Sequence, residues 1–403
     1  MLRKVSRHGV GYSVADLNNV RYVFVSAVSP DGSDLAEQTL GALETVGQVI
    51  HEEATLGTIV RQAVFVREPT DIEPCREVIH EFYGPDLPAT TYVVQPPCEG
   101  RRVAIEAWGV SRRSGHLEIE RVSENLVILH HDGIAWAHCA GIRADAPPGA
   151  VHERSLGAFT AARELLADHG FAFDQVVRTW LYLGDIVGPE GDGQRYQELN
   201  RARADFYQGT RFLAKFVPPT FDGTIYPAST GIGARGCEVT MGCIAFSTAR
   251  DDIRVLPLEN PVQTPAFRYE PRHSPHSPRF SRAVAIVGRQ ACAILVSGTA
   301  SILGSETFAP TDVAAQTNRT LDNIATLISP ENFTRHGIEG VGASLGDLAL
   351  ARVYVKRPED YPTTRAVCDE RLGELPVVFA IADVCRPELL VEIEGVAVVP
   401  IRR

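Results

Sequence analysis

The sequence predicts an α+β protein made of three tandem units, each a mixed β-sheet with two helices on one face. The same order of elements occurs three times: an apolar strand, a Gly/Ser/Pro turn, an amphipathic helix, a second strand, a second helix and a closing strand. The helical segments carry apolar residues at three- and four-residue spacing, as at Leu321, Ile324, Leu327 and Ile328. The strand segments are alternating or continuous runs of Val, Ile, Ala and Tyr, as in buried strands.

The units are expected over residues 1–120, 121–250 and 251–403, and each closing strand contains a glutamate. The first has a strand at 20–32, a helix at 37–53, a strand at 59–68, a helix at 74–84 and a closing strand at 103–110 with Glu106. The second has these elements at 134–145, 153–170, 176–187, 194–208 and 236–247, with Glu238. The third has them at 291–302, 314–329, 348–357, 360–373 and 389–399, with Glu394.

A proline-rich connector at 256–283 precedes the third unit. It holds six prolines, too many for a helix, and it is too long for an ordinary loop. Phe267, Tyr269 and Phe280 give it apolar anchors. We therefore expect an ordered segment that wraps over the protein.

Composition excludes several classes of protein. The chain has 403 residues and a net charge of -11, which disfavours general binding to nucleic acids or anionic membranes. No apolar run is long enough to span a bilayer, and the first 19 residues lack the apolar stretch of a secretory signal. A cytoplasmic protein is expected. Arginine supplies nearly all of the 39 basic residues, so planar guanidinium groups would hold a dicarboxylate ligand.

The cysteines predict neither disulfides nor a metal site. They lie in apolar surroundings without a CxxC pair, and no HExxH motif is present. We expect buried free thiols and no metal. The eight positions are Cys75, Cys98, Cys139, Cys237, Cys243, Cys292, Cys368 and Cys385.

Two resemblances follow from particular segments. The three units, with the closing VEIEGVA at 391–397, resemble the Rid (YjgF/UK114) fold, which implies an intramolecular pseudo-trimer and favours a monomer over a homo-oligomer. Residues 120–403 resemble the chorismatase family, which removes pyruvate from chorismate without a metal or organic cofactor. The matching segments are QELNRARADF, YPASTGIG, LPLENPVQTPAF, SPHSPRFSRA, VSGTASI, RVYVKRPEDY, RLGELP and ADVCRPELLVEIEG. The first 120 residues match only the general fold and are expected to form a degenerate unit.

The same scaffold could also serve an imine deaminase or a non-catalytic metabolite-binding protein. Rid imine deaminases place a carboxylate-binding arginine shortly after a proline on the strand before the final glutamate. The third unit has Val377 and Val378 there, and the other units lack the pattern as well, which disfavours a deaminase. A non-catalytic metabolite-binding protein would have lost cleft residues in all three units, whereas the third retains them.

Cleavage of the enol-pyruvyl ether requires a general acid that is protonated near neutral pH. A glutamate flanked by Ile393 and Val396 suits this role, because an apolar site raises a carboxyl pKa. We predict Glu394, which matches the catalytic glutamate of the family. Glu392 shares its face of the strand, so the two also read as a solvent-facing pair.

The resemblance implies further ligand residues in a cleft between the second and third units. Arg371, near a helix C-terminus, and Arg203 are expected to bind carboxylates, although Arg371 also suits the helix dipole and Arg203 a surface ion pair. Tyr269 is expected to bind a carboxylate or cover the ring, or else to anchor the connector.

Small residues are expected to shape the pocket. Ser297, Gly298, Thr299 and Ala300 would form its floor, and the turn that begins at Tyr226 would form the opposite wall. Cys385 is either a core residue or a pocket thiol. The resemblance implies two outcomes, hydrolysis to a dihydroxycyclohexadiene carboxylate or aromatisation to 3-hydroxybenzoate. A thiol favours the second and Ala300 the first, so the product stays open.

Overall fold

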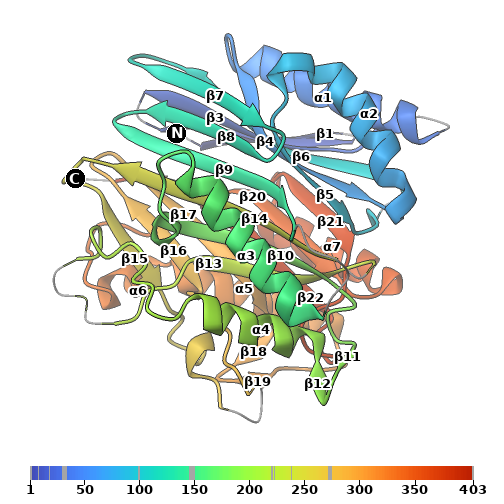
Figure 1. Ribbon diagram of the computed structural model, residues 1–403, viewed down its shortest axis with the longest axis vertical. Coiled ribbons are helices and arrows are strands. Elements are labelled where there is room, and N and C mark those ends of the chain that lie inside the picture. Colours follow the sequence, from blue (N-terminus) through green and yellow to red (C-terminus); the bar gives the residue numbers. More distant parts are fainter. Residues whose placement is uncertain are drawn as a thin grey trace.

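The computed structural model describes residues 2–401 apart from 8, 18, 30–33, 99, 145–149, 219–220, 222, 237 and 271–274. Cys237 therefore lies outside the described residues. The chain forms three six-stranded sheets, each with helices on one face (Figure 1). This confirms the predicted α+β class and its three tandem units.

Each unit contains six sheet strands and two long helices. In the first these are β1 (Leu2–Arg7), β2 (Val10–Leu17), β3 (Val20–Ala27), α1 (Leu35–Glu53), β4 (Thr58–Val66), α2 (Ile72–Tyr83), β5 (Ala89–Val94) and β6 (Val103–Arg112). In the second they are β7 (Leu117–Ser123), β8 (Leu126–His131), β9 (Ile134–Ile142), α3 (Val151–Ala167), β10 (Val176–Gly184), α4 (Arg195–Phe206), β13 (Ala228–Ala234) and β14 (Val239–Thr248), with a small hairpin of β11 (Pro189–Glu190) and β12 (Gly193–Gln194). In the third they are β15 (Arg254–Leu258), β16 (Ala283–Val287), β17 (Ala291–Ala300), α5 (Val313–Ile328), β20 (Leu348–Val355), α7 (Tyr361–Leu372), β21 (Val377–Ile381) and β22 (Val391–Pro400), with the short helix α6 (Pro330–Arg335) and a hairpin of β18 (Ile302–Leu303) and β19 (Glu306–Thr307).

The three sheets share one topology. The strand orders are β1-β2-β3-β6-β4-β5, β7-β8-β9-β14-β10-β13 and β15-β16-β17-β22-β20-β21. In each sheet the last two strands are parallel, while the others pair antiparallel. A crossover helix joins each parallel pair, as such connections require. The predicted boundary at 120 falls inside β7, and that at 250 falls between β14 and β15.

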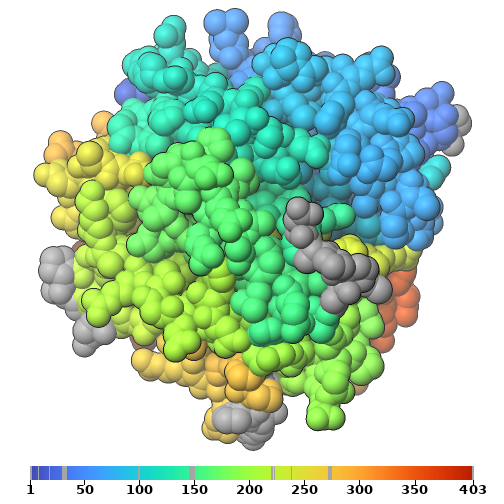
Figure 2. Space-filling model, viewed as in Figure 1, coloured from blue at the N-terminus to red at the C-terminus, as the bar shows by residue number. Residues whose placement is uncertain are grey.

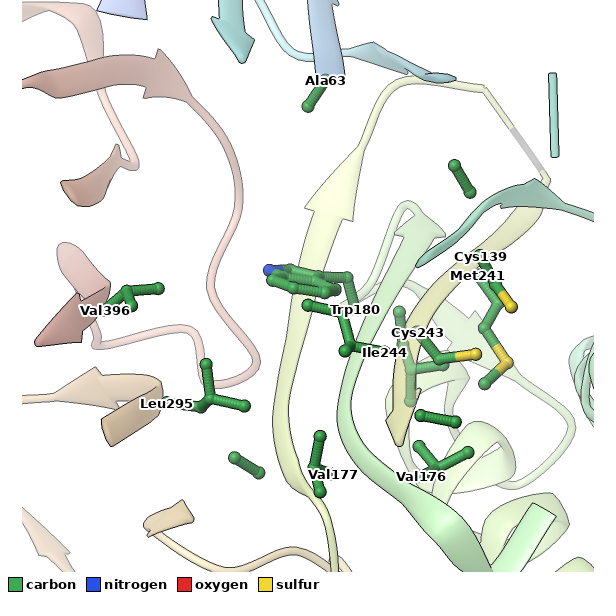
Figure 3. Close-up of a cluster of buried hydrophobic side chains, with 14 of the residues drawn as sticks. Ala63, Cys139, Val176, Val177, Trp180, Met241, Cys243, Ile244, Leu295 and Val396 are labelled. Carbon is green, nitrogen blue, oxygen red and sulfur yellow. The ribbon is translucent and has the colours of Figure 1, made fainter. Parts of the chain in front are cut away.

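Helices cover one face of each sheet, and the other faces meet in the centre of the molecule. α1 packs on β3 and β6, α3 on β9 and β14, and α5 on β17 and β22. Leu321, Ile324, Leu327 and Ile328 of α5 are buried, as their spacing predicts. The central core draws side chains from all three units, among them Ala63, Trp180 and Val396 (Figure 3).

The units close into a ring. β5 of the first unit packs on β9 of the second, β13 of the second on β17 of the third, and β21 of the third on β3 of the first. Figure 2 shows the first two units, in blue and green, in contact over one face of the molecule. Three similar junctions between the units therefore arise.

The structure also contains strands that the periodicity did not predict. The first two strands of each sheet and the short strand after the second helix were missed. β1 and β7 lie at sheet edges and mix exposed with half-buried residues, so they lack the apolar pattern of a buried strand. Glu238 was wrongly placed on a closing strand: it precedes β14 and is exposed. The position of β14 that matches Glu106 and Glu394 is Gly242.

The proline-rich segment leaves from β15 and returns to its neighbour β16, so it is an insertion within one hairpin. Its described residues include several that are buried: Asn260, Gln263, Ala266, Phe280, Ser281 and Arg282. The expected ordered wrap is confirmed for these residues. The segment lies over the junction of the second and third units.

Candidate active site

A cavity of about 280 Å³ lies between the second and third units. α4 and β13 form one wall, β17 and β22 form the other, and the connector and the loop before β22 complete it. The lining residues are Gln194, Tyr196, Gln197, Arg203, Ser229, Gly231, Tyr269, Pro278, Phe280, Arg282, Gly298, Ala300, Ile302, Glu306, Cys385, Arg386, Pro387, Glu388, Leu389 and Glu392. The cleft therefore lies where the sequence placed it.

Glu392 presents a carboxyl group to this cavity. It pairs with Ala300 across the β17–β22 ladder, and only 4% of its surface is exposed. Among the described residues, no group donates a hydrogen bond to its carboxyl oxygens. Burial, and secondly the charge of Glu394, raise the pKa of Glu392 to about 8, against the opposite effect of Arg178 and Arg282. Glu392 is therefore mostly protonated at neutral pH.

Gly298 makes room for that carboxyl. A β-carbon at Gly298 would overlap Oε1 of Glu392, and it would also approach the methyl group of Thr230 at 3.1 Å. The register of β17 against β22 shifts between Val296 and Thr299, which brings the Gly298 backbone beneath Glu392. The predicted role of Gly298 in the pocket floor agrees with this position.

Glu394 does not line the cavity, although it leaves the same face of β22. Its carboxylate accepts hydrogen bonds from Arg178 Nη2 at 2.7 Å, from Trp180 Nε1 at 2.8 Å and from the Thr230 hydroxyl. Arg352 Nη1 lies 3.3 Å from its Oε1. These groups outweigh the effect of burial and lower the pKa of Glu394, so it is ionised. The structure therefore does not place Glu394, the predicted proton donor, in the cavity wall; Glu392 is the glutamate of β22 that lines it.

The groups around Glu394 belong to a buried charged cluster at the centre of the ring. Arg352 of the third unit forms a two-point salt bridge with Glu106 of the first unit, with N–O distances of 2.5 and 2.7 Å. Arg61 of the first unit stacks on Trp180, with its Cζ 4.0 Å from the ring centre. It has no carboxylate partner on β14, because Gly242 stands where the other two units have Glu106 and Glu394. Burial lowers the pKa of Arg61 to about 10.

Two arginines supply buried positive charge to the cavity. Arg203 is 1% exposed and donates to Asn200 Oδ1 at 2.5 Å and to Ser229 Oγ at 3.3 Å. Arg282 is 3% exposed and donates to the Tyr269 hydroxyl at 2.6 Å. The Nε atom of each is buried without a hydrogen-bond partner. Arg203 thus lies in the predicted cleft, and Arg201 instead pairs with Glu198 on the surface.

Aromatic groups order these arginines. Phe280 lies between them, with its ring centre 5.7 Å from Cζ of Arg203 and 5.6 Å from Cζ of Arg282. Arg386 stacks over the Tyr269 ring at 5.3 Å. Tyr269 thus lines the cavity, as predicted, and holds two cations in place.

Cys385 and Ala300 lie in the same lining, as the sequence predicted. Burial raises the pKa of the Cys385 thiol to about 12, so the thiol is neutral. The Cys385 carbonyl accepts a hydrogen bond from Gln194 Nε2 at 3.3 Å, which ties the loop before β22 to the second unit.

Besides Glu394, four predicted site residues lie outside the cavity wall. Arg371 on α7 pairs with Asp322 of α5 at 2.9 Å and donates to the Asn318 carbonyl, so it joins two helices of its own unit. Ser297 donates to the Ser281 carbonyl and Thr299 to the Ser297 carbonyl. Tyr226 packs against Tyr207, Phe212 and Phe267. Ser297, Thr299 and Tyr226 lie behind the cavity wall, whereas Arg371 belongs to the helical layer of its own unit.

Arg282, Tyr196, Gln194 and Arg386 were missed. Arg282 ends the segment SPRFSRA, which the resemblance quoted, and an arginine just before a buried strand was the available signal. Tyr196 lies two turns before Arg203 on the same face of α4, and Gln194 lies just ahead of that helix, so helical spacing from Arg203 points toward them.

The other two junctions lack a glutamate at the position of Glu392. The residue that matches Glu392, two positions before Glu106 and Gly242, is Ala104 in the first unit and Thr240 in the second. Ala104 lines a smaller cavity of about 100 Å³ between the first and third units. The cavity at Glu392 is therefore chemically distinct from the other junctions.

Neither a metal-binding cluster nor a membrane-spanning helix occurs among the described residues. They contain no cluster of three His, Cys, Asp or Glu side chains placed to hold a metal ion. None of the helices in the described part of the chain is long and apolar enough to cross a membrane.

Comparison with known proteins adds three kinds of similarity. Residues 106–245 match the family described as "Chorismatase FkbO/Hyg5-like, N-terminal". A protein called 3-hydroxybenzoate synthase from Streptomyces hygroscopicus is 37% identical over 277 residues, covering 66% of this chain and 76% of the relative. A protein called chorismatase from Streptomyces rapamycinicus is 38% identical over 275 residues, covering 66% and 77%. A crystal structure of a chorismatase matches with a TM-score of 0.64 and 25% identity, covering 84% of this chain and 93% of that one.

Proposed function

The chain belongs to the chorismatase family, and on that premise we propose that it cleaves the enol-pyruvyl ether of chorismate and releases pyruvate, with Glu392 as proton donor. The observation that carries this proposal is the buried carboxyl group of Glu392, whose pKa burial raises to about 8, in a cavity lined by buried arginines. A neutral acid and a dicarboxylate-binding site are what the reaction requires.

The reaction begins with transfer of the Glu392 proton to the methylene carbon of the enol ether. The C–H bond that forms uses the π electrons of the double bond, and an oxocarbenium centre develops beside the ether oxygen. An oxygen nucleophile then adds to this centre and gives its proton to the Glu392 carboxylate. Glu392 passes this proton to the ether oxygen as the bond between that oxygen and the centre breaks, so the ring keeps a hydroxyl group at C3. A last proton returns to the carboxylate as pyruvate leaves, which restores the acid.

The substrate carries two carboxylates, and the cavity offers buried donors for them. Arg203 and Arg282 each keep an Nε–H without a partner, and a charge-assisted hydrogen bond to a carboxylate would satisfy it. Arg386 adds a third cation to the wall. Fixing both carboxylates holds the methylene carbon near Glu392.

The ring product depends on which oxygen reaches the oxocarbenium centre. Addition of water yields a dihydroxycyclohexadiene carboxylate, and the last proton then comes from the added water. Attack by the ring C4 oxygen instead carries that oxygen into pyruvate. The C4–O bond breaks with its electron pair on oxygen, the hydrogen on C3 leaves as a proton to Glu392, and the ring becomes 3-hydroxybenzoate. We assign the second route to this chain. The neutral thiol of Cys385 in the lining and the relative called 3-hydroxybenzoate synthase support this assignment.

The test is incubation of the purified protein with chorismate in EDTA, with pyruvate followed enzymatically and the ring product identified by mass and ultraviolet spectrum. We expect pyruvate and 3-hydroxybenzoate in equal amounts. A non-aromatic diol would contradict the assigned route but support ether cleavage. If pyruvate stays at the spontaneous rate, the proposed function is wrong, and imine substrates become the next assay.

The proposal includes a monomer in the cytoplasm. The closed ring of three junctions within one chain supports the first part. The seven described cysteines, all free thiols, support the second. Light scattering coupled to gel filtration checks the monomer: a mass of two or more chains would contradict it.

A further inference from the structure

Glu394 places a second carboxylate two residues from Glu392 on the same face of β22, and its hydrogen-bond donors lower its pKa. We infer that Glu394 is a positioning residue whose fixed negative charge keeps Glu392 protonated in the working pH range. This inference rests on the proposed function for its kinetic meaning, but the carboxyl titration described below tests it without substrate.

The geometry holds the two carboxyl groups side by side in different surroundings. Both leave one face of β22, separated by Ile393, whose side chain points into the opposite core. Glu392 opens into the cavity and has no donor among the described residues, while Glu394 accepts from Arg178, Trp180 and Thr230. The charge is therefore assigned to Glu394 and the proton to Glu392.

Thr230 connects the two positions. Its hydroxyl donates to Glu394 and accepts from the Gly298 N–H at 2.9 Å and from Arg178 Nη2 at 2.6 Å. Gly298 lies beneath the Glu392 carboxyl. The Thr230 hydroxyl thus contacts both the Glu394 carboxylate and the Gly298 backbone beneath Glu392. These contacts keep the two carboxyl groups in their separate surroundings.

Other charged groups face Glu392, and none of them duplicates the effect of Glu394. Arg178 and Arg282 act in the opposite direction and favour the ionised form of Glu392. Glu306 and Glu388 lie in the wall formed by the third unit, but neither contributes to the shift in the pKa of Glu392. The titratable groups that face the acid from all elements are Glu394 on β22, Arg178 on β10, Tyr196 and Arg203 on α4, Tyr269 and Arg282 on the connector, Glu306 on β19, and Cys385, Arg386 and Glu388 on the loop before β22.

The experiment compares Glu394→Gln with Glu394→Asp. The amide keeps the shape and removes the charge, whereas the aspartate keeps the charge. We expect the alkaline limb of the kcat profile to move to lower pH in Glu394→Gln, with about tenfold less activity for each unit by which the assay pH exceeds the new pKa. Activity should return as the pH is lowered. In Glu394→Asp the limb should stay close to that of the wild type.

A purely structural role gives a different result. The activity of Glu394→Gln would then fall by one factor at every pH, and the limb would not move, which would overturn the inference. Glu370→Gln on the exposed face of α7 removes the same charge far from the cavity and should leave the profile unchanged. Glu259, buried behind Arg282 with its pKa raised to about 7, titrates in both proteins and cancels in the comparison.

Carbon-13 NMR of glutamate-labelled protein tests the inference even if Glu394→Gln fails to fold or chorismate is not the substrate. In the wild type, the carboxyl signal that disappears in Glu392→Gln should titrate near pH 8. A second buried carboxyl should remain ionised through neutral pH. If the buried pair instead shows Glu394 protonated at neutral pH, its charge cannot act on Glu392, and the inference fails whatever the substrate.

Discussion

Gly298 lies directly beneath the carboxyl group of Glu392, so closely that a β-carbon there would overlap Oε1. The relationship arises from the register shift in β17, which turns the backbone toward the acid. The Glu392 carboxyl can occupy this position only because Gly298 on the neighbouring strand has no side chain. Both β17 and β22 therefore determine where the carboxyl group lies.

Replacing Gly298 by alanine should therefore displace Glu392 and lower kcat by about 100-fold or more, because proton transfer depends on positioning. Pyruvate release measures this. Gly47→Ala on α1 is the matched control, since its new β-carbon would meet its nearest neighbour at an ordinary 3.5 Å. Normal turnover in Gly298→Ala would show that the acid tolerates displacement.

Removal of the proton itself should be the most damaging change. Glu392→Gln keeps the shape of the side chain but cannot donate an acidic proton, so kcat should fall by about 10²–10⁴-fold with the fold retained. Circular dichroism checks folding and pyruvate release checks turnover. Glu374→Gln in the turn after α7 serves as a control with the same side-chain replacement at an exposed position. Near-normal turnover of Glu392→Gln would contradict the assignment of the acid.

Wild-type turnover should depend on pH with a known sign. Glu392 is neutral below its pKa of about 8 and ionised above it, so kcat should be highest below that value and fall about tenfold per unit above it. A stopped assay of kcat between pH 6 and pH 10 measures the limb. If kcat instead rose through pH 8, the ionised form would be the active one.

Substrate affinity should depend on Arg203 and Arg282. Lysine keeps the charge but loses the planar donor pair, so Arg203→Lys and Arg282→Lys should each lower kcat/KM by roughly 10–100-fold. Arg371→Lys should leave kcat/KM unchanged, since Arg371 binds Asp322 on the neighbouring helix. Equal losses in all three variants would indicate a general effect on folding.

The raised pKa of Glu392 also costs stability at higher pH. Between the unfolded pKa of 4.5 and the folded value of about 8, the native state holds a proton that the unfolded chain has lost, so stability falls as pH rises through this window. Glu392→Gln carries no such proton. The Tm of Glu392→Gln minus the Tm of the wild type should therefore rise from pH 5 to pH 8 and then level off. Thermal unfolding at several pH values measures this difference.

The central salt bridge should matter far more than surface pairs. Arg352→Met leaves Glu106 buried without its partner, which should cost about 3–5 kcal/mol of unfolding free energy. Arg357→Met breaks a solvent-exposed pair with Asp360 and should cost far less unfolding free energy. Urea unfolding of both variants measures the difference. Similar losses would mean that the central pair is not held out of water.

The sequence revealed the units, their helices and the cleft, because each depends on local periodicity or on contiguous segments. It could not separate Glu392 from Glu394. The two differ only in what faces them across the ring, and Arg178, Trp180 and Thr230 all come from another unit more than 150 residues earlier in the chain. Arg282 was missed for the same reason, since its burial depends on how the connector folds back over β16.

The matching positions on β22, β6 and β14 hold Glu392, Ala104 and Thr240, so only one of the three junctions has a glutamate at this position. In an assembly of identical subunits, any substitution appears in every cleft at once. Joining the copies into one polypeptide removes that coupling, and each cleft can change while its neighbours keep the scaffold closed. A tight-binding inhibitor should therefore titrate this protein at one equivalent per chain, with two junctions left to maintain the shape of the third.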